Sequence, residues 1–66
     1  PGAIATDFGG GAVRDNAQLN RAVASNTALG RVGQADDIGS VMAVLLSEQT
    51  YWINGQRVEA SGGVML

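Results

Sequence analysis

One stretch of the sequence, residues 30–47, shows a clear helical period and constrains the fold more than any other feature. Its apolar residues recur at intervals of three and four, which places them on one face of a helix. They are Ile38, Val41, Met42, Leu45 and Leu46. Asp36 and Asp37 fall where the positive end of the helix dipole would lie, so we interpret them as dipole and capping residues. The pattern predicts a helix over residues 35–47.

A second face of this predicted helix consists of small residues, namely Gly39, Ser40 and Ala43. Small side chains allow another helix or strand to approach closely, so this face is predicted either to be covered by a second element or to face solvent. The sequence does not decide between these two interpretations.

The chain is short and has none of the usual cross-links of small domains. Its 66 residues make one domain at most, and a chain of this length buries only about 60% of the surface that it exposes when unfolded. Without Cys or His it has no disulfide and no good ligand set for zinc, and we expect no metal site. Because the core residues are few and the first residue is Pro1, we expect a piece of a longer protein; the alternative is a processed native chain.

The charge pattern argues against nucleic acid and membranes as partners. The net charge is −2, and the four basic residues are scattered arginines rather than the basic stripe of a nucleic-acid binder. No apolar run approaches the length of a membrane span, and no secretion leader is visible. The lack of cysteine fits a cytoplasmic protein, which is what we expect.

Two loop-rich segments flank a weaker helix candidate in the first half. Pro1 and Gly2 form a turn signal, and a run of glycines at residues 9–11 predicts either a mobile loop that closes over something or a plain connector. Residues 15–26 predict a surface helix, with Asp15 as its N-cap and Gln18 reaching back as in a capping box.

The last part of the chain predicts a turn and a strand. Asn54 and Gly55 form a strong turn signal after the aromatic pair at 51–52. Residues 56–60 alternate in polarity, as in a half-buried strand, and the glycines at 62–63 end it.

A survey for catalytic groups is negative. The absence of His, Cys and Lys excludes the Ser-His-Asp triad, cysteine nucleophiles and lysine bases. Asp36 and Asp37 are adjacent and point about 100° apart on a helix, so they do not form a facing carboxylate pair. Tyr51 has no neighbouring basic residue to lower its pKa, so we interpret it as a packing or surface residue. By composition and spacing alone, this chain is not an enzyme by itself.

Four segments together resemble the C-terminal part of a short-chain dehydrogenase/reductase. P-G-A-I-A-T at residues 1–6 is similar to the family's P-G-x-[IV]-x-T element, and L-G-R-V-G-Q-A-D-D-I-G at residues 29–39 is similar to its G-R-x-G-x-P-E-D-I-A run. Y-W-I-N-G-Q at residues 51–56 resembles Y-I-T-G-Q, and S-G-G at residues 61–63 resembles D-G-G. Each segment alone is weak, whereas four in the family's order cover nearly the whole chain. The departures are Ala35 for a proline, Asn54 for a threonine and Ser61 for an aspartate.

The resemblance implies an α/β fold, with this chain as the C-terminal part of a Rossmann-type doubly wound parallel sheet. Residues 1–6 would form the nicotinamide-side turn, residues 7–29 the substrate lid, residues 30–48 the packing helix, and residues 51–66 the last strand and tail. The implied function is hydride transfer between NAD or NADP and a carbonyl or alcohol substrate. The family's glycine-rich cofactor turn and Ser-Tyr-Lys set precede these residues, so the chain alone is expected to be inactive, and Tyr51 does not match the catalytic tyrosine because no lysine follows it.

The resemblance also implies roles for individual residues. Pro1 and Gly2 would turn the chain beside the cofactor. Ile4 would offer its backbone to the nicotinamide carboxamide, and Thr6 would offer its hydroxyl to the carboxamide or to a phosphate oxygen. Lid residues would cover the substrate, namely Phe8, Gly9, Gly10 and Gly11. Residues 35–47 and 56–60 would contact a second copy and build a homo-oligomer. The alternative function is a non-enzymatic module that self-associates through the same helix and strand.

Overall fold

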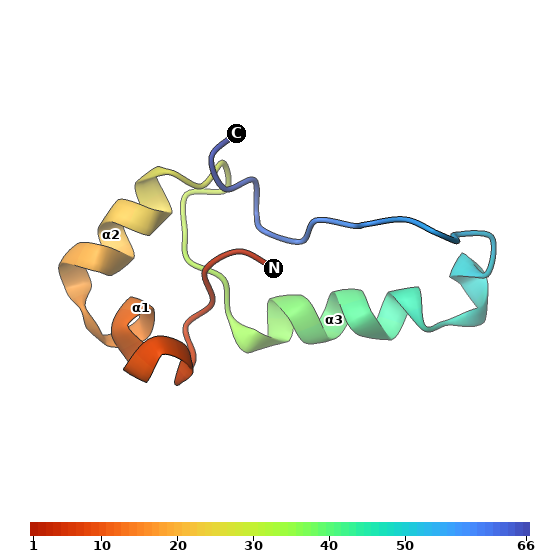
Figure 1. The fold of residues 1–66 in the computed structure, drawn as a ribbon, viewed down its shortest axis with the longest axis horizontal. Coiled ribbons are helices and arrows are strands. Elements are labelled where there is room, and N and C mark those ends of the chain that lie inside the picture. Colours follow the sequence, from red (N-terminus) through yellow and green to blue (C-terminus); the bar gives the residue numbers. More distant parts are fainter.

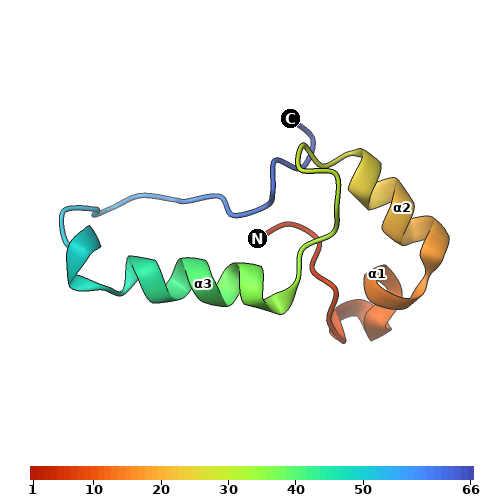
Figure 2. The same ribbon diagram turned by 180° about the vertical axis from the view of Figure 1, so that it is seen from behind.

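A computed structural model describes all 66 residues, which form an elongated molecule of 41 × 24 × 16 Å (Figure 1). Its elements in chain order are the 3-10 turn η1 and the helices α1, α2 and α3, followed by the 3-10 turn η2. Their bounds are Phe8–Gly11, Ala12–Asp15, Ala17–Ser25, Ala35–Leu45 and Glu48–Thr50. The last stretch of chain runs back alongside α3, as both views show (Figures 1 and 2).

Helix α3 confirms the helix predicted from the apolar period, although it ends at Leu45 and not at residue 47. Asp37 caps its first turn, because the carboxylate accepts a hydrogen bond of 2.7 Å from the backbone N–H of Gln34. At the other end the Ser47 hydroxyl donates to the carbonyl of Val44 at 2.6 Å, which satisfies one of the free carbonyls of the last turn. The predicted capping role is therefore confirmed for Asp37.

Helix α2 confirms the surface helix but not its predicted cap. The helix begins at Ala17, and the side chain of Asn16 accepts a hydrogen bond of 3.0 Å from the N–H of Leu19. The prediction of Asp15 as N-cap was wrong, because Asp15 is the last residue of α1 and its carboxylate binds Arg14 instead. Asparagine and aspartate cap equally well, so local propensity did not separate the two neighbours.

The strand predicted at residues 56–60 does not form in this structure. These residues are extended but belong to no ladder, and the chain contains only two isolated bridges. A strand needs the backbone of a neighbouring strand, and the neighbour here is α3, whose peptide groups already bond within the helix. The alternation of polarity therefore predicted the extended conformation correctly and the sheet pairing wrongly.

Three distant segments meet where the two bridges form, and we call this meeting point the junction: residues 3–5, 26–34 and 60–65. A parallel bridge joins Ile4 to Gly33, and an antiparallel bridge joins Thr27 to Val64. Figures 1 and 2 both show the N-terminal segment lying between the start of α3 and the last residues of the chain. The junction holds together the α1–α2 half of the molecule and the α3 half.

Most of the apolar side chains remain exposed. Val32 is the one buried hydrophobic residue, and Thr27 and Gly11 are the other two buried residues. On the predicted apolar stripe of α3, Val41 is half-buried, whereas Met42 and Leu46 remain 53% and 81% exposed. No helix of the structure has the length and hydropathy needed to cross a membrane.

Candidate functional site

The backbone of Ile4 has one edge bonded to the junction and one edge free. The N–H of Gly33 donates to the carbonyl of Ala3 at 3.0 Å, and the N–H of Ala5 donates to the carbonyl of Gly33 at 2.9 Å. In this parallel pairing the N–H and the carbonyl of Ile4 itself point away from Gly33. The N–H of Ile4 donates to no acceptor in the chain, although the residue is half-buried. Ile4 thus presents a fixed backbone donor to whatever lies on its free side.

Thr6 adds a second free donor two residues later. Its N–H donates to the carbonyl of Ile4 at 2.9 Å in a tight turn, and its Oγ1 accepts the N–H of Phe8 at 3.2 Å. The hydrogen of the Thr6 hydroxyl donates to no group of the chain. Residues 4–6 therefore carry two free donors, and the carbonyl of Ile4 lies between them in a segment that the Gly33 bridge holds in place.

Gly2 lies against Ser61, which organises the opposite side of the junction. A Cβ atom added to Gly2 would come within 3.0 Å of the Ser61 Cβ, so the two backbones are closely packed. The Ser61 hydroxyl accepts hydrogen bonds from the N–H groups of Gly63 and Val64 at 3.3 and 3.2 Å and donates to Glu59 at 2.7 Å. This serine, which stands where the family has an aspartate, can thus cap the glycine turn without a charge.

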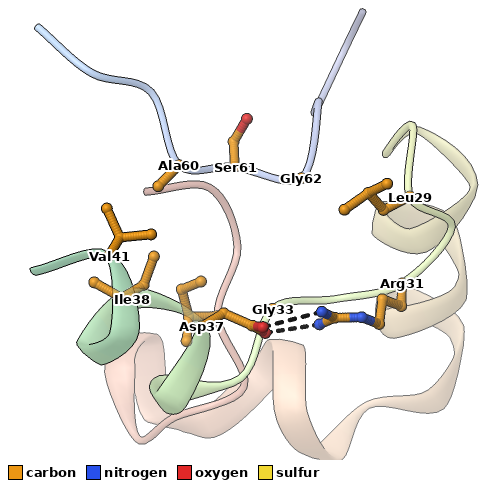
Figure 3. Close-up of a pocket in the computed structure, with 10 residues that line it drawn as sticks. Leu29, Arg31, Gly33, Asp37, Ile38, Val41, Ala60, Ser61 and Gly62 are labelled. Atoms are coloured by element: carbon orange, nitrogen blue, oxygen red, sulfur yellow. Dashed lines mark hydrogen bonds and ion pairs between the residues drawn. The ribbon is translucent and has the colours of Figure 1, made fainter. Parts of the chain in front are cut away.

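A pocket of about 160 Å³ opens in the junction, beside the residues just described (Figure 3). Its lining comes from the N-terminal segment, the segment before α3, the first two turns of α3 and residues 60–62. The lining residues are Ile4, Leu29, Arg31, Gly33, Asp37, Ile38, Val41, Ala60, Ser61 and Gly62.

An ion pair forms one wall of this pocket, as the dashed lines in Figure 3 show. The Arg31 guanidinium donates to both carboxylate oxygens of Asp37, at 2.7 and 3.0 Å. The hydrogen bonds from Arg31, followed by that from the Gln34 backbone, lower the pKa of Asp37 to about 2. This pair ties the segment before α3 to its first turn and keeps the Asp37 carboxylate ionised to a lower pH than an ordinary aspartate.

The predicted lid residues lie on the turn η1 and do not line the pocket, and all of them except the buried Gly11 are exposed. Phe8 is 90% exposed, and Gly9 and Gly10 have no atoms near the position of a Cβ. Tyr51 is also exposed and packs edge-on against Trp52, with 6.1 Å between ring centroids, which confirms its interpretation as a surface residue. No group of three or more carboxylates is placed to hold a metal ion.

Comparison of the sequence with known proteins assigns the chain to a family. The family described as enoyl-(acyl carrier protein) reductase, which is part of the short-chain dehydrogenases/reductases, matches residues 1–65. The chain belongs to the short-chain dehydrogenase/reductase family. This membership confirms the resemblance carried by the four sequence segments, and it implies a Rossmann-like fold.

Curated relatives of this short-chain dehydrogenase/reductase chain are oxidoreductases by name. An uncharacterized oxidoreductase of Methylorubrum extorquens is 38% identical over 97% of this chain and 26% of its own length. A dehydrogenase of Cochliobolus heterostrophus is 38% identical over 83% and 24%. An NADPH-dependent aldehyde reductase of Arabidopsis thaliana chloroplasts is 35% identical over 100% and 24%. The chain thus spans about a quarter of the length of these relatives. No solved structure matches it significantly.

The structure of this dehydrogenase/reductase chain brings some predicted site residues together and adds others. Ile4 lies in the junction, Gly2 and Thr6 lie beside it, and Phe8 and the following glycines lie on η1. Sequence reasoning did not single out Gly33 as the partner of Ile4. The signal in the sequence was the glycine itself, because a glycine without another role often marks a close approach of two segments. In the structure a Cβ at Gly33 would come within 2.5 Å of the Ile4 Cδ1.

Proposed function

We propose that residues 1–66 are the C-terminal part of an NAD(P)-dependent oxidoreductase that transfers hydride between nicotinamide and a carbonyl or alcohol substrate. Family membership supports the oxidoreductase chemistry, and the name of the Arabidopsis relative, an NADPH-dependent reductase, supports a nicotinamide cofactor. The observation that carries the proposal is the free N–H of Ile4 on a backbone segment held by Gly33. The cofactor, when bound, supplies or accepts the hydride.

The nicotinamide carboxamide has one acceptor oxygen and two donor hydrogens, and the residues present fit that pattern. The free N–H of Ile4 matches the carboxamide oxygen, while its carbonyl, which has a second lone pair beside the bond from Thr6, matches the carboxamide NH₂. The free hydroxyl hydrogen of Thr6 is available to the carboxamide or a phosphate oxygen. Pro1 and Gly2 set the turn before these groups, and Ser61 packs against it.

In this proposal residues 7–29 are the substrate lid. The segment leaves the nicotinamide turn directly after Thr6, and it exposes Phe8 and Leu19 on its outer surface. An apolar side chain exposed beside a cofactor turn suits contact with the substrate, which the lid would shield from water during hydride transfer. Residues 1–66 supply no catalytic acid or base in this scheme.

The test uses the protein at its full encoded length and separates the nicotinamide end of the cofactor from the rest. Thr6→Val removes the hydroxyl and preserves the shape of the side chain. We expect it to weaken binding of the reduced cofactor by about three- to tenfold, the usual effect of one lost hydrogen bond. ADP-ribose, or its 2′-phosphate for an NADP enzyme, lacks the nicotinamide. We expect the affinity for this ligand to stay unchanged. Fluorescence titration and calorimetry measure the two affinities.

Ile4→Pro is the second variant, because proline removes the backbone donor that carries the proposal. It is expected to show the same selective loss, while Gln49→Ala at an exposed position of η2 is the control and should change neither affinity. Equal losses for the cofactor and for ADP-ribose, or no loss in either variant, would contradict the proposed nicotinamide contact.

We also propose that α3 and residues 56–60 contact a second copy of the chain. The small-residue face is fully open, since Gly39, Ser40 and Ala43 are exposed and a Cβ at Gly39 would meet nothing within 4 Å. Val58 is exposed as well, so both elements present uncovered surface. The same surface supports the second candidate function, a self-associating module without enzyme activity.

A charge placed on this face tests the contact. Ala43→Glu is expected to weaken self-association about tenfold or more, because a buried carboxylate would lack a partner. Gln18→Glu adds the same charge to an exposed position of α2 and serves as the control. Sedimentation over a range of concentrations gives the association constants. A dispersed monomer in the unmodified protein, or equal effects of both substitutions, would contradict the contact. Self-association without any nicotinamide binding would favour the module over the enzyme.

A further inference from the structure

A single arginine gathers the first part of the proposed lid. The Arg14 guanidinium donates from Nε and Nη2 to the two carboxylate oxygens of Asp15, at 2.7 and 2.8 Å. Its third nitrogen, Nη1, donates to the carboxylate of Asp7. Asp7 directly follows Thr6, so Arg14 connects the end of the nicotinamide-side turn with α1 across seven residues.

The glycine turn passes directly beneath this guanidinium. Gly11 is one of the three buried residues, and a Cβ placed on it would come within 2.5 Å of the Arg14 Nη2. Its N–H donates to the carbonyl of Asp7 at 3.0 Å, which closes the turn from the backbone side. Gly9, Gly10 and Gly11 have φ values of 63°, 74° and 77°, a conformation in which other residues are strained.

We propose that Arg14 is a positioning residue that clasps residues 7–15 and fixes the direction in which the lid leaves the nicotinamide-side turn. Three successive glycines on their own have a broad conformational freedom, and ordering them costs backbone entropy. The clasp selects one conformation by binding the two ends of the turn, Asp7 and Asp15, with one rigid planar group. Its consequence for substrate rests on the proposed function, whereas its consequence for the turn does not.

The clasp is exposed, and this determines how it responds to its surroundings. The Asp7 and Asp15 side chains are 95% and 61% exposed. Hydrogen bonding to Arg14 lowers the pKa of Asp15, and the carboxylates of Asp15 and Asp7 raise the pKa of Arg14, so the clasp stays charged near neutral pH. Salt screens exposed charges, so we expect the clasp to be weak but sensitive to ionic strength.

Hydrogen exchange at the Gly11 amide in the protein at its full encoded length tests the clasp. Arg14→Gln and Asp7→Asn are each expected to speed this exchange about two- to fivefold, the range for an exposed ion pair. The double variant should show no further increase, because both changes break the same contact. Raising the salt concentration from about 0.01 to about 1 M should speed exchange in the unmodified protein and leave Arg14→Gln unaffected.

Arg21→Gln is the matched control, because Arg21 is an exposed arginine of α2 that forms no ion pair. Gly11→Ala is an independent variant, since its methyl group would displace the guanidinium, and it should also speed exchange at the neighbouring amides. Exchange at Gly11 that is the same in Arg14→Gln and in Arg21→Gln would overturn the clasp.

The effect on substrate needs a separate readout. With cofactor binding intact, Arg14→Gln is expected to raise the KM for the carbonyl substrate about two- to fivefold and to change kcat less. Arg14→Lys should restore only part of the loss, because an ammonium group cannot bridge both carboxylates. Faster exchange with an unchanged KM would overturn the positioning role toward substrate. Failure of the proposed function would show differently, as absent cofactor binding with the exchange result intact.

Discussion

Asp37 and its neighbour Asp36 show how far residue identity alone determines a role. The sequence predicted the same dipole and capping role for both, yet Asp37 alone accepts the Gln34 N–H and the two bonds from Arg31. The difference depends on where the loop before α3 brings Arg31, six residues earlier in the chain. Local pattern therefore predicted the kind of interaction, and the path of the loop decided which residue makes it.

The lowered pKa of Asp37 makes a prediction about pH. Its folded-state pKa, about 2, lies below the ordinary value of 3.8, so the ionised carboxylate stabilises the folded protein. This contribution is fully present above the ordinary value and is lost as pH falls through about 2. In the protein at its full encoded length, Asp37→Asn should therefore lower the unfolding midpoint in urea at pH 7, and the difference from the unmodified protein should shrink as the pH falls toward 2. A difference that is independent of pH would contradict the role of the charge.

A substitution at Gly33 should cause a steric clash with Ile4 and lower stability. Gly33→Ala would place a Cβ within 2.5 Å of the Ile4 Cδ1, and the Ile4 side chain would have to move. We expect a loss of about 1–3 kcal/mol in the free energy of unfolding, the usual range for overpacking. Gln49→Ala at an exposed position of η2 is the control and should change the free energy of unfolding by less than about 0.5 kcal/mol. Urea unfolding of the protein at its full encoded length compares the two variants.

The elements differ in how much of them the sequence could predict. Helices bond within themselves, so the apolar period and the capping signals located α3 and α2 to within about two residues. Residues 56–60 needed a partner strand, and nothing in their own sequence supplies one. The nicotinamide-side role of residues 1–6 was predicted from their resemblance to a family element, and both that role and the contacts with a cofactor stay predictions.

The N-cap of α2 supplies the prediction at the scale of elements. Asn16→Ala removes the side-chain acceptor for the Leu19 N–H and should cost about 1 kcal/mol of helix stability. Gln18→Ala, an exposed position without a side-chain hydrogen bond, is the control and should have little effect. Loss of helical circular dichroism on heating compares the two variants. An unchanged Asn16→Ala variant would contradict the observed cap.

The whole molecule exposes far more surface than a compact protein of its mass. Its accessible area is 5217 Å² for 6.7 kDa, against about 3,900 Å² expected from the size scaling of folded monomers. Its radius of gyration is 13.5 Å, against about 11 Å for a compact chain of this length. The exposed stripe of α3 and the unpaired residues 56–60 account for part of this difference, and both are surfaces that a Rossmann-like sheet would cover.

This excess surface predicts the behaviour of the 66 residues by themselves. With Val32 as the only buried hydrophobic residue, we expect the isolated chain to unfold on heating without a sharp calorimetric transition. It should also show no turnover of NADH or NADPH with any carbonyl substrate, because the family resemblance predicts that the Ser-Tyr-Lys set precedes these residues. Reproducible nicotinamide turnover by the isolated chain would contradict the proposed division of roles.

The junction also has a consequence for the order of events during protein synthesis. Its antiparallel bridge joins Thr27 to Val64, and the N–H of Met65 donates to the carbonyl of Asn26 at 2.7 Å. The hydrogen-bond partners of residues 26–29 are therefore synthesised more than thirty positions later in the chain. A ribosome-bound chain can wind α2 and α3 early, since helices close locally, but the junction can close only after residue 65 leaves the exit tunnel. A translation pause before residue 65 has left the exit tunnel would prolong the time for which the junction stays open.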